Sequence, residues 1–236
     1  MTKSLLLLSS LMFLFVSCKK ETEYPPNEVV FAGDYNVRDY SKEYDLLQGA
    51  DSYRRIVTIT EEVKTDYRRF NEGPDSGGGS GGLYEDTFDI DVINSNFQFT
   101  NDYQWTMDFE ANLELISESS SETIEHKLSQ TGYFEILQPG LGAEFDFKLK
   151  LHFVSFTSDI KQKWFDGDGN IISELIFPNY YTQGSSVRDA VTFNATLDGD
   201  VLVLNTPEGF DDCCDSYTRN TFMINEAEVN LTLVLK

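Results

Sequence analysis

The sequence predicts an all-β domain built from antiparallel strands. Apolar and polar side chains alternate with a two-residue period along many segments, and turn-forming sequences separate those segments. No crossover helix of the kind that a parallel sheet needs can be recognised between them. Aromatic residues, which favour strands, make up 14% of the chain. We therefore expect an antiparallel barrel of roughly ten strands, with a two-sheet β-sandwich as the alternative.

The clearest alternation runs from Tyr103 to Leu115, where every second side chain is apolar and the residues between them are polar. The same period occurs in residues 88–92, 145–153, 191–197 and 229–235. Each of these segments is expected to form a strand with one buried face. Residues 41–50 are expected to hold a short helical turn instead. Alternating strands also occur in transmembrane barrels, but a lipid anchor would make that second attachment redundant.

Composition restricts the classes of function. The chain has 236 residues, of which 40% are hydrophobic, so one large domain can bury a sizeable core. Its 40 acidic and 18 basic residues give a net charge of -22, which would repel a phosphate backbone, so we expect no nucleic-acid partner. Two histidines and no recognisable pairing of a nucleophile with a base lead us to expect no enzyme, no cofactor and no metal.

The N-terminus has the features of an export signal: Lys3, an apolar run from Leu5 to Val16, and then Ser17 and Cys18. The end of this run resembles the lipobox of bacterial lipoproteins. The resemblance implies that residues 1–17 are a signal peptide, that Cys18 carries the lipid, and that residues 18–28 form a tether. An ordinary cleaved secretory signal is the alternative. Residues 29–236 are then expected to form a single β domain.

Residues after the cysteine indicate where such a lipoprotein would be sorted. In the lipoprotein family, Lys19 directly after the lipidated cysteine implies the outer membrane rather than retention at the inner membrane. Glu21 and Glu23 resemble the acidic tether of lipoproteins that reach the cell surface. We expect an outer-membrane protein that is lipid-anchored and either surface-exposed or periplasm-facing.

The start of the domain, Phe31-Ala-Gly33-Asp-Tyr35, resembles the opening of lipocalin-like domains, with Tyr35 in place of the family's tryptophan. The resemblance implies a lipocalin-like (calycin-type) barrel that holds a small apolar or amphipathic ligand. The residues expected to bind this ligand are Tyr35, Trp105, Phe109 and Phe147. The alternative is an interaction or structural lipoprotein without a cavity, whose acidic surface contacts proteins or glycans.

The remaining motifs have simpler explanations. Residues 166–170 begin like a calcium-binding loop, but Ile171 and Phe177 stand where that loop needs glycine and glutamate, so we expect a tight turn. The Gly-rich stretch at residues 71–82 is expected to be a flexible insertion, because no helix follows it to complete a phosphate-binding or nucleophile motif.

Cysteine and histidine are few. Cys213 and Cys214 are adjacent, and in an oxidising envelope they are expected to form a local, strained disulfide. Free thiols, or metal and redox chemistry, are the alternatives.

His126 lies in line with Ile124 and Leu128, whereas His152 falls on the other face of its strand, so we expect two ordinary strand histidines in different environments.

Overall fold

The computed structural model describes residues 29–48, 51–71, 82–116, 121–177, 190–207 and 228–236. The predicted signal peptide, Cys18, most of the Gly-rich insertion and the pair Cys213 and Cys214 lie outside these residues.

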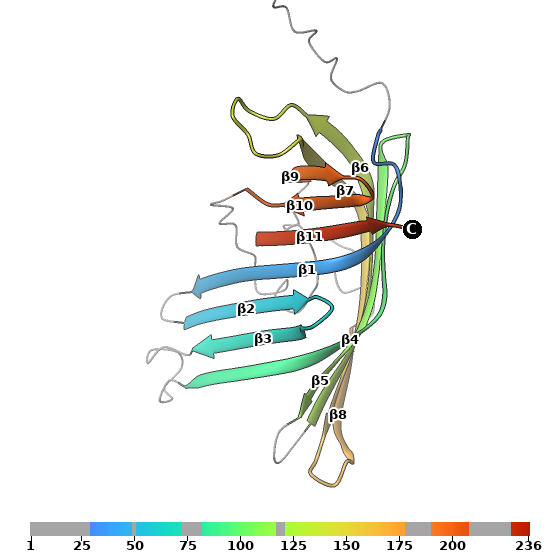
Figure 1. The fold of residues 1–236 in the computed structure, drawn as a ribbon. Coiled ribbons are helices and arrows are strands. Elements are labelled where there is room, and N and C mark those ends of the chain that lie inside the picture. Colours follow the sequence, from blue (N-terminus) through green and yellow to red (C-terminus); the bar gives the residue numbers. More distant parts are fainter. Residues whose placement is uncertain (1–28, 49–50, 72–81, 117–120, 178–189, 208–227) are drawn as a thin grey trace, which may run out of the picture.

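The described residues form an all-β domain, which confirms the predicted fold class (Figure 1). Every strand pairing is antiparallel, and no described residue is helical. The strands are β1 (Gly33–Gln48), β2 (Asp51–Ile59), β3 (Lys64–Asn71), β4 (Leu83–Phe99), β5 (Gln104–Ile116), β6 (Ser121–Leu137), β7 (Phe147–Phe165), β8 (Ile171–Phe177), β9 (Ala190–Asp198), β10 (Val201–Asn205) and β11 (Glu228–Leu235).

The helical turn expected within residues 41–50 is wrong, because β1 continues through Gln48. Lys42 pairs with Val57 of β2 on one side and with Val229 of β11 on the other. A backbone that is hydrogen-bonded to a strand on each side has no freedom to adopt helical angles, so sheet formation overrides the local sequence here.

The sheet closes on itself as a ring of ten strands. The order is β6-β5-β4-β3-β2-β1-β11-β10-β9-β7, and an additional pairing of β6 with β7 completes the ring. The eleventh strand, β8, pairs with β7 and lies outside the ring. The arrangement is therefore barrel-like, as predicted.

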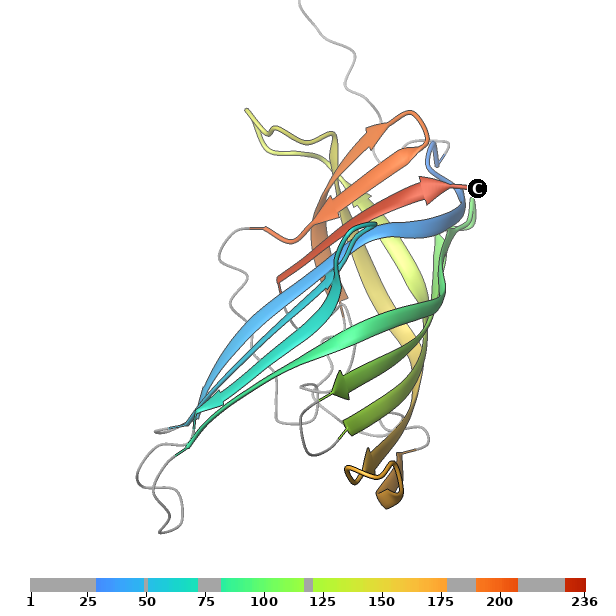
Figure 2. The ribbon, with the colours of Figure 1, turned by 60° about the horizontal axis from the view of Figure 1, so that its bottom comes forward.

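One end of the ring is narrower than the other. Gly33–Asn36 of β1 pairs directly with Asn96–Phe99 of β4, so a shorter circuit of eight strands bypasses β2 and β3. Farther along, the β2–β3 hairpin fits between β1 and β4, and both strands carry register shifts where they separate. We call the end with the direct β1–β4 pairing the narrow half and the end that includes β2 and β3 the wide half (Figures 1 and 2).

Aromatic side chains fill the narrow half. Phe31, just before β1, lies with its ring 5.2 Å from those of Phe99 and Phe147. The hydroxyl of Tyr35 donates a 2.7 Å hydrogen bond to the carbonyl of Phe31, which fixes the segment before β1 against this core. Phe97 stacks between Phe99 and Trp105, at centroid distances of 5.0 and 5.6 Å. Such contacts add to the free energy gained by burying the rings.

Candidate functional site

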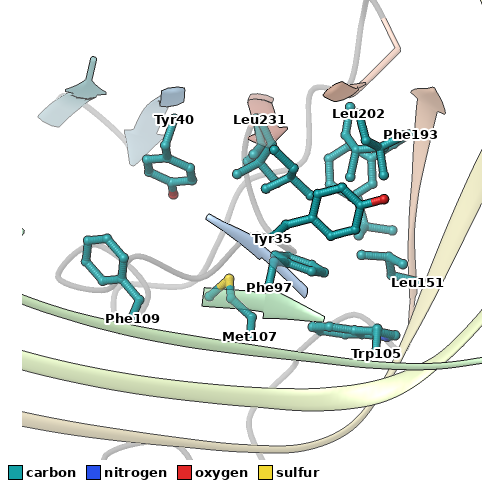
Figure 3. Close-up of a cluster of buried hydrophobic side chains, with 14 of the residues drawn as sticks. Tyr35, Tyr40, Phe97, Trp105, Met107, Phe109, Leu151, Phe193, Leu202 and Leu231 are labelled. Carbon is teal, nitrogen blue, oxygen red and sulfur yellow. The ribbon is translucent and has the colours of Figure 1, made fainter. Parts of the chain in front are cut away.

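The four residues predicted to bind a ligand all lie inside the ring and are buried, with exposed fractions of 2% for Tyr35, 0% for Trp105 and 7% for Phe109 and Phe147. Tyr35, Trp105 and Phe147 belong to the aromatic core of the narrow half. The indole Nε1 of Trp105 donates a 3.1 Å hydrogen bond to the carbonyl oxygen of His152. Phe109 lies apart from Tyr35 and Trp105 and faces Tyr40 across the interior (Figure 3).

A small apolar cavity lies beside Phe109. Its volume is about 10 Å³, and its lining includes Val37, Tyr40, Met107 and Leu231. A cavity needs about 10 to 15 Å³ to hold one water molecule, so this space holds no ligand as it stands. A ligand here would have to displace side chains. Met107 is the residue best suited to move, because its unbranched side chain has three rotatable bonds.

Gln130 is a polar residue in the same part of the interior. It lies on β6 opposite Met107 of β5, and its side chain is 0% exposed. Neither Oε1 nor Nε2 of its amide hydrogen-bonds to any described residue. A buried polar atom without a partner costs about 1 to 3 kcal/mol, so this amide destabilises the fold unless something else satisfies it.

The wide half contains an ionic triad formed by Arg55 of β2 with Asp66 and Arg68 of β3, in which Arg55 and Asp66 are fully buried and Arg68 is partly exposed. The two arginines are directly opposite each other on paired strands, an arrangement that is repulsive by itself. Asp66 lies between them and accepts two hydrogen bonds from Arg55, at 2.7 and 2.6 Å, and two from Arg68, at 3.1 and 2.8 Å. The guanidinium of Arg68 also lies 4.4 Å from the centre of the Phe88 ring.

Charge in the triad determines the ionisation of Asp66. Burial alone would raise the pKa of this carboxyl group, but attraction to Arg55 and Arg68 and the hydrogen bonds from both outweigh it and hold the pKa at about 2. Asp66 is therefore ionised at every physiological pH.

His126 lies on β6, and the positive charges of Arg55 and Arg68 also affect its ionisation. Its Nε2 lies 3.0 Å from the hydroxyl of Ser158 on β7, and both side chains are buried. Burial lowers the pKa of His126 to about 3, and repulsion by Arg55, Lys42 and Arg68 adds to the effect. His126 is therefore neutral inside the ring at physiological pH.

Tyr40 connects the apolar cavity to this ionic region. Its ring lines the cavity, while burial raises the pKa of its hydroxyl and Arg55 partly opposes that shift. The interior thus changes from aromatic in the narrow half to ionic in the wide half, with Tyr40, Phe109 and Gln130 between the two regions.

The other motifs singled out in the sequence lie elsewhere. His152 stacks on Tyr133, with a centroid distance of 4.3 Å, and it does not share a site with His126. Residues 166–170 form a turn in which the Asp166 carboxylate accepts hydrogen bonds from the backbone of Asp168 and Asn170. The described part of the chain contains no cluster of three or more histidine, cysteine, aspartate or glutamate residues able to hold a metal ion. It also contains no helix long and apolar enough to cross a membrane.

The ionic residues of the interior were missed from sequence, although a signal for some of them exists. Arg55 occupies the same face of its strand as Val57 and Ile59, and Gln130 continues the inward series of His126 and Leu128. A polar residue at an apolar position of an alternating strand therefore marks Arg55 and Gln130, whereas the strand that carries Asp66 and Arg68 has no apolar alternation for them to interrupt.

Comparisons with known proteins give no relatives: no family model, no curated protein and no solved structure matches this chain.

Proposed function

We propose that this chain is a lipid-anchored lipoprotein of the bacterial outer membrane, and that its ring-shaped domain binds a small amphipathic ligand inside. The anchor would be attached to Cys18. The ligand would lie at the boundary between the two halves of the ring, with its apolar part against Phe109 and Met107 and one hydrogen-bonding group on Gln130.

The observation that carries the ligand proposal is the amide of Gln130. An apolar residue of similar size would fill the same position at no cost in hydrogen bonding. A buried amide whose two polar atoms have no partner among the described residues is explained if a ligand carbonyl, hydroxyl or amide group supplies the missing bonds.

A second candidate function is favoured by the packing of the narrow half. The predicted ligand residues Tyr35, Trp105 and Phe147 are in contact with other core residues, and the apolar cavity beside Phe109 holds only about 10 Å³. A ring filled in this way would suit an interaction or structural lipoprotein that contacts proteins or glycans through its outer surface.

Substitution of Gln130 distinguishes the two candidates. Gln130→Leu should raise the free energy of unfolding by about 1 to 3 kcal/mol, because it removes the unsatisfied amide. If the ligand proposal holds, the wild-type protein should also bind a hydrophobic fluorescent probe such as anilinonaphthalene sulfonate saturably, near one-to-one, with a change in Trp105 emission. The variant should bind more weakly.

Phe109→Ala provides the second measurement. It should change the affinity for the probe with a modest loss of stability if the interior opens to admit a ligand. If the interior is a fixed core, the same substitution should cost about 3 to 5 kcal/mol. That cost, together with no saturable binding to the wild type, would overturn the ligand proposal in favour of the interaction protein.

The anchor is tested separately. Cys18→Ala should abolish metabolic labelling with a fatty acid, because no other side chain at that position can form the thioether. Labelling that persists in the variant would show that the segment is not a lipoprotein signal.

A further inference from the structure

The strand β8 lies outside the ring and is exposed along nearly its whole length. One edge pairs with β7 through Ile160–Phe165, and no described strand pairs with its other edge. Figures 1 and 2 show the β7–β8 hairpin at the end of the molecule away from the C-terminus. Ring closure does not use β8, so the fold itself does not require this strand to be apolar.

The side chains of β8 are nevertheless apolar on both faces. Ile172 and Ile176 share the outer face with Glu174, and they are 65% and 62% exposed. Ile171 and Leu175, on the other face, are 56% and 44% exposed. Large apolar side chains are rarely left in water on both sides of one strand, and grouped exposure of this kind marks interaction sites.

Natural proteins protect exposed edge strands with lysine, proline or a covering segment. The sequence of β8, Ile-Ile-Ser-Glu-Leu-Ile-Phe, contains neither lysine nor proline. Glu174 is its single charge, and it lies 3.6 Å from Lys161 of β7. The edge therefore presents hydrogen-bonding backbone between apolar side chains, which is the geometry that strand addition uses.

A hollow of about 310 Å³ adjoins this strand on the outer surface. Its lining includes Ile176 and Phe177 of β8, together with Lys161 and Asp159 of β7 and Glu125 of β6. Its β6 and β7 lining lies on the paired side of β8, so the hollow is not part of the free edge.

We propose that β8 is a docking edge for an extended segment of a partner protein, which adds to the sheet as a further antiparallel strand. The bound segment would carry apolar residues on both faces and a basic residue opposite Glu174. We call Ile171, Ile172, Glu174, Leu175 and Ile176 the β8 surface.

The negative charge of the chain favours a basic partner segment over a second copy of the chain. Residues 159–177 contain four acidic and two basic side chains, a net charge of -2, and the whole chain carries -22. Two such chains repel each other, whereas a basic segment is attracted.

The test uses the full chain and a labelled peptide, Thr-Ile-Val-Lys-Val-Ile-Thr, followed by fluorescence anisotropy at protein concentrations up to about 1 mM. Saturable binding is expected. The double variant Ile172→Lys/Ile176→Lys should weaken it at least about tenfold, since lysine protects strand edges. Val154→Lys, a matched change at a β7 residue that is 70% exposed and does not pair with β8, should leave the affinity unchanged.

Two modified peptides identify the mode of binding. Glutamate in place of the central lysine should weaken binding by about two- to fivefold, the range for an exposed ion pair. Methylation of alternate backbone amides should abolish binding, because it removes the donors of the ladder.

Three results would overturn the proposal. The first is binding that is absent or insensitive to the double variant, and the second is binding that survives backbone methylation, which would indicate nonspecific apolar adhesion. The third is a dimer in sedimentation velocity that the double variant dissociates, which would make a second copy the occupant. None of these results bears on the interior ligand, because β8 lies outside the ring.

Discussion

Among the glycines assessed in the described part of the chain, Gly132 on β6 leaves the least room for a side chain. A Cβ atom there would lie 1.7 Å from the carbonyl oxygen of His152 on β7 and 2.7 Å from Nε1 of Trp105. Carbon and oxygen atoms normally approach no closer than about 3.3 Å. The obstructing atom belongs to backbone, so the paired strands would have to separate by about 1.5 Å to accept Gly132→Ala.

The cost of this substitution has two parts. Forcing apart two packed strands costs about 1 to 3 kcal/mol. The same movement breaks the hydrogen bond from Trp105 to His152 and leaves a buried indole N–H without a partner, for about 1 to 3 kcal/mol more. We expect a loss of about 4 kcal/mol, a large share of the roughly 5 to 15 kcal/mol by which domains are stable.

Urea unfolding followed by tryptophan fluorescence measures this loss. Gly140→Ala is the matched control, because apart from its chain neighbours no atom lies within 4 Å of a Cβ at that glycine, and its φ is not in the left-handed region. The control should be neutral, or stabilising by up to about 1 kcal/mol through the unfolded chain. If the free energies of unfolding of the two variants differ by less than about 1 kcal/mol, β6 and β7 do not approach each other so closely at Gly132.

Three further predictions concern the ionic interior. Asp66→Asn should cost about 3 to 5 kcal/mol, because it leaves two arginines without their shared carboxylate, whereas Glu85→Gln, which removes an exposed partner of Arg69, should cost less than about 1 kcal/mol. The native pKa of His126 is about 3, below its unfolded value of 6.5, so the unfolded chain binds a proton first and the free energy of unfolding should fall as the pH is lowered from 6.5 to 3. That slope, up to about 1.4 kcal/mol per pH unit, should be lost in His126→Gln and persist in His152→Gln. The contribution of Asp66 is fully present above its unfolded pKa of 3.8 and should be lost as the pH falls through about 2, a change absent from Asp66→Asn.

The sequence predicts the class of fold because its information is local. Alternation from Trp105 to Leu113 specifies which side chains face inward, and the structure buries Trp105, Met107, Phe109, Ala111 and Leu113. The closure of the ring cannot be predicted from local alternation. The pairing of Gly33 with Phe99, which creates the narrow half, joins residues far apart in the chain, and no two-residue pattern specifies such a partner.

Dependence on strand register also explains why the ionic triad inside the ring was not predicted from the sequence. A charged residue on an inward face, such as Arg55, is a visible anomaly in the sequence. Its compensation by Asp66 depends on the register of β2 against β3, which becomes known only with the structure. The aromatic residues were predictable as inward-facing for the opposite reason: alternation alone buries them, whatever strand lies opposite.

The interior is aromatic in the narrow half and ionic in the wide half, and this division helps to explain why the ring contains the ionic triad. Stability can be supplied by the narrow half, where aromatic side chains pack against one another without buried charge. Replacing a buried ion pair by apolar residues of similar volume is often neutral or stabilising, so stability alone does not account for Arg55, Asp66 and Arg68. The wide half exists because the β2–β3 hairpin enters the ring, and that hairpin is the element that carries all three residues. Under the ligand proposal, the same hairpin would both enlarge the ring and supply the polar part of its interior, so that an amphipathic molecule could meet apolar and ionic surroundings within one enclosed space.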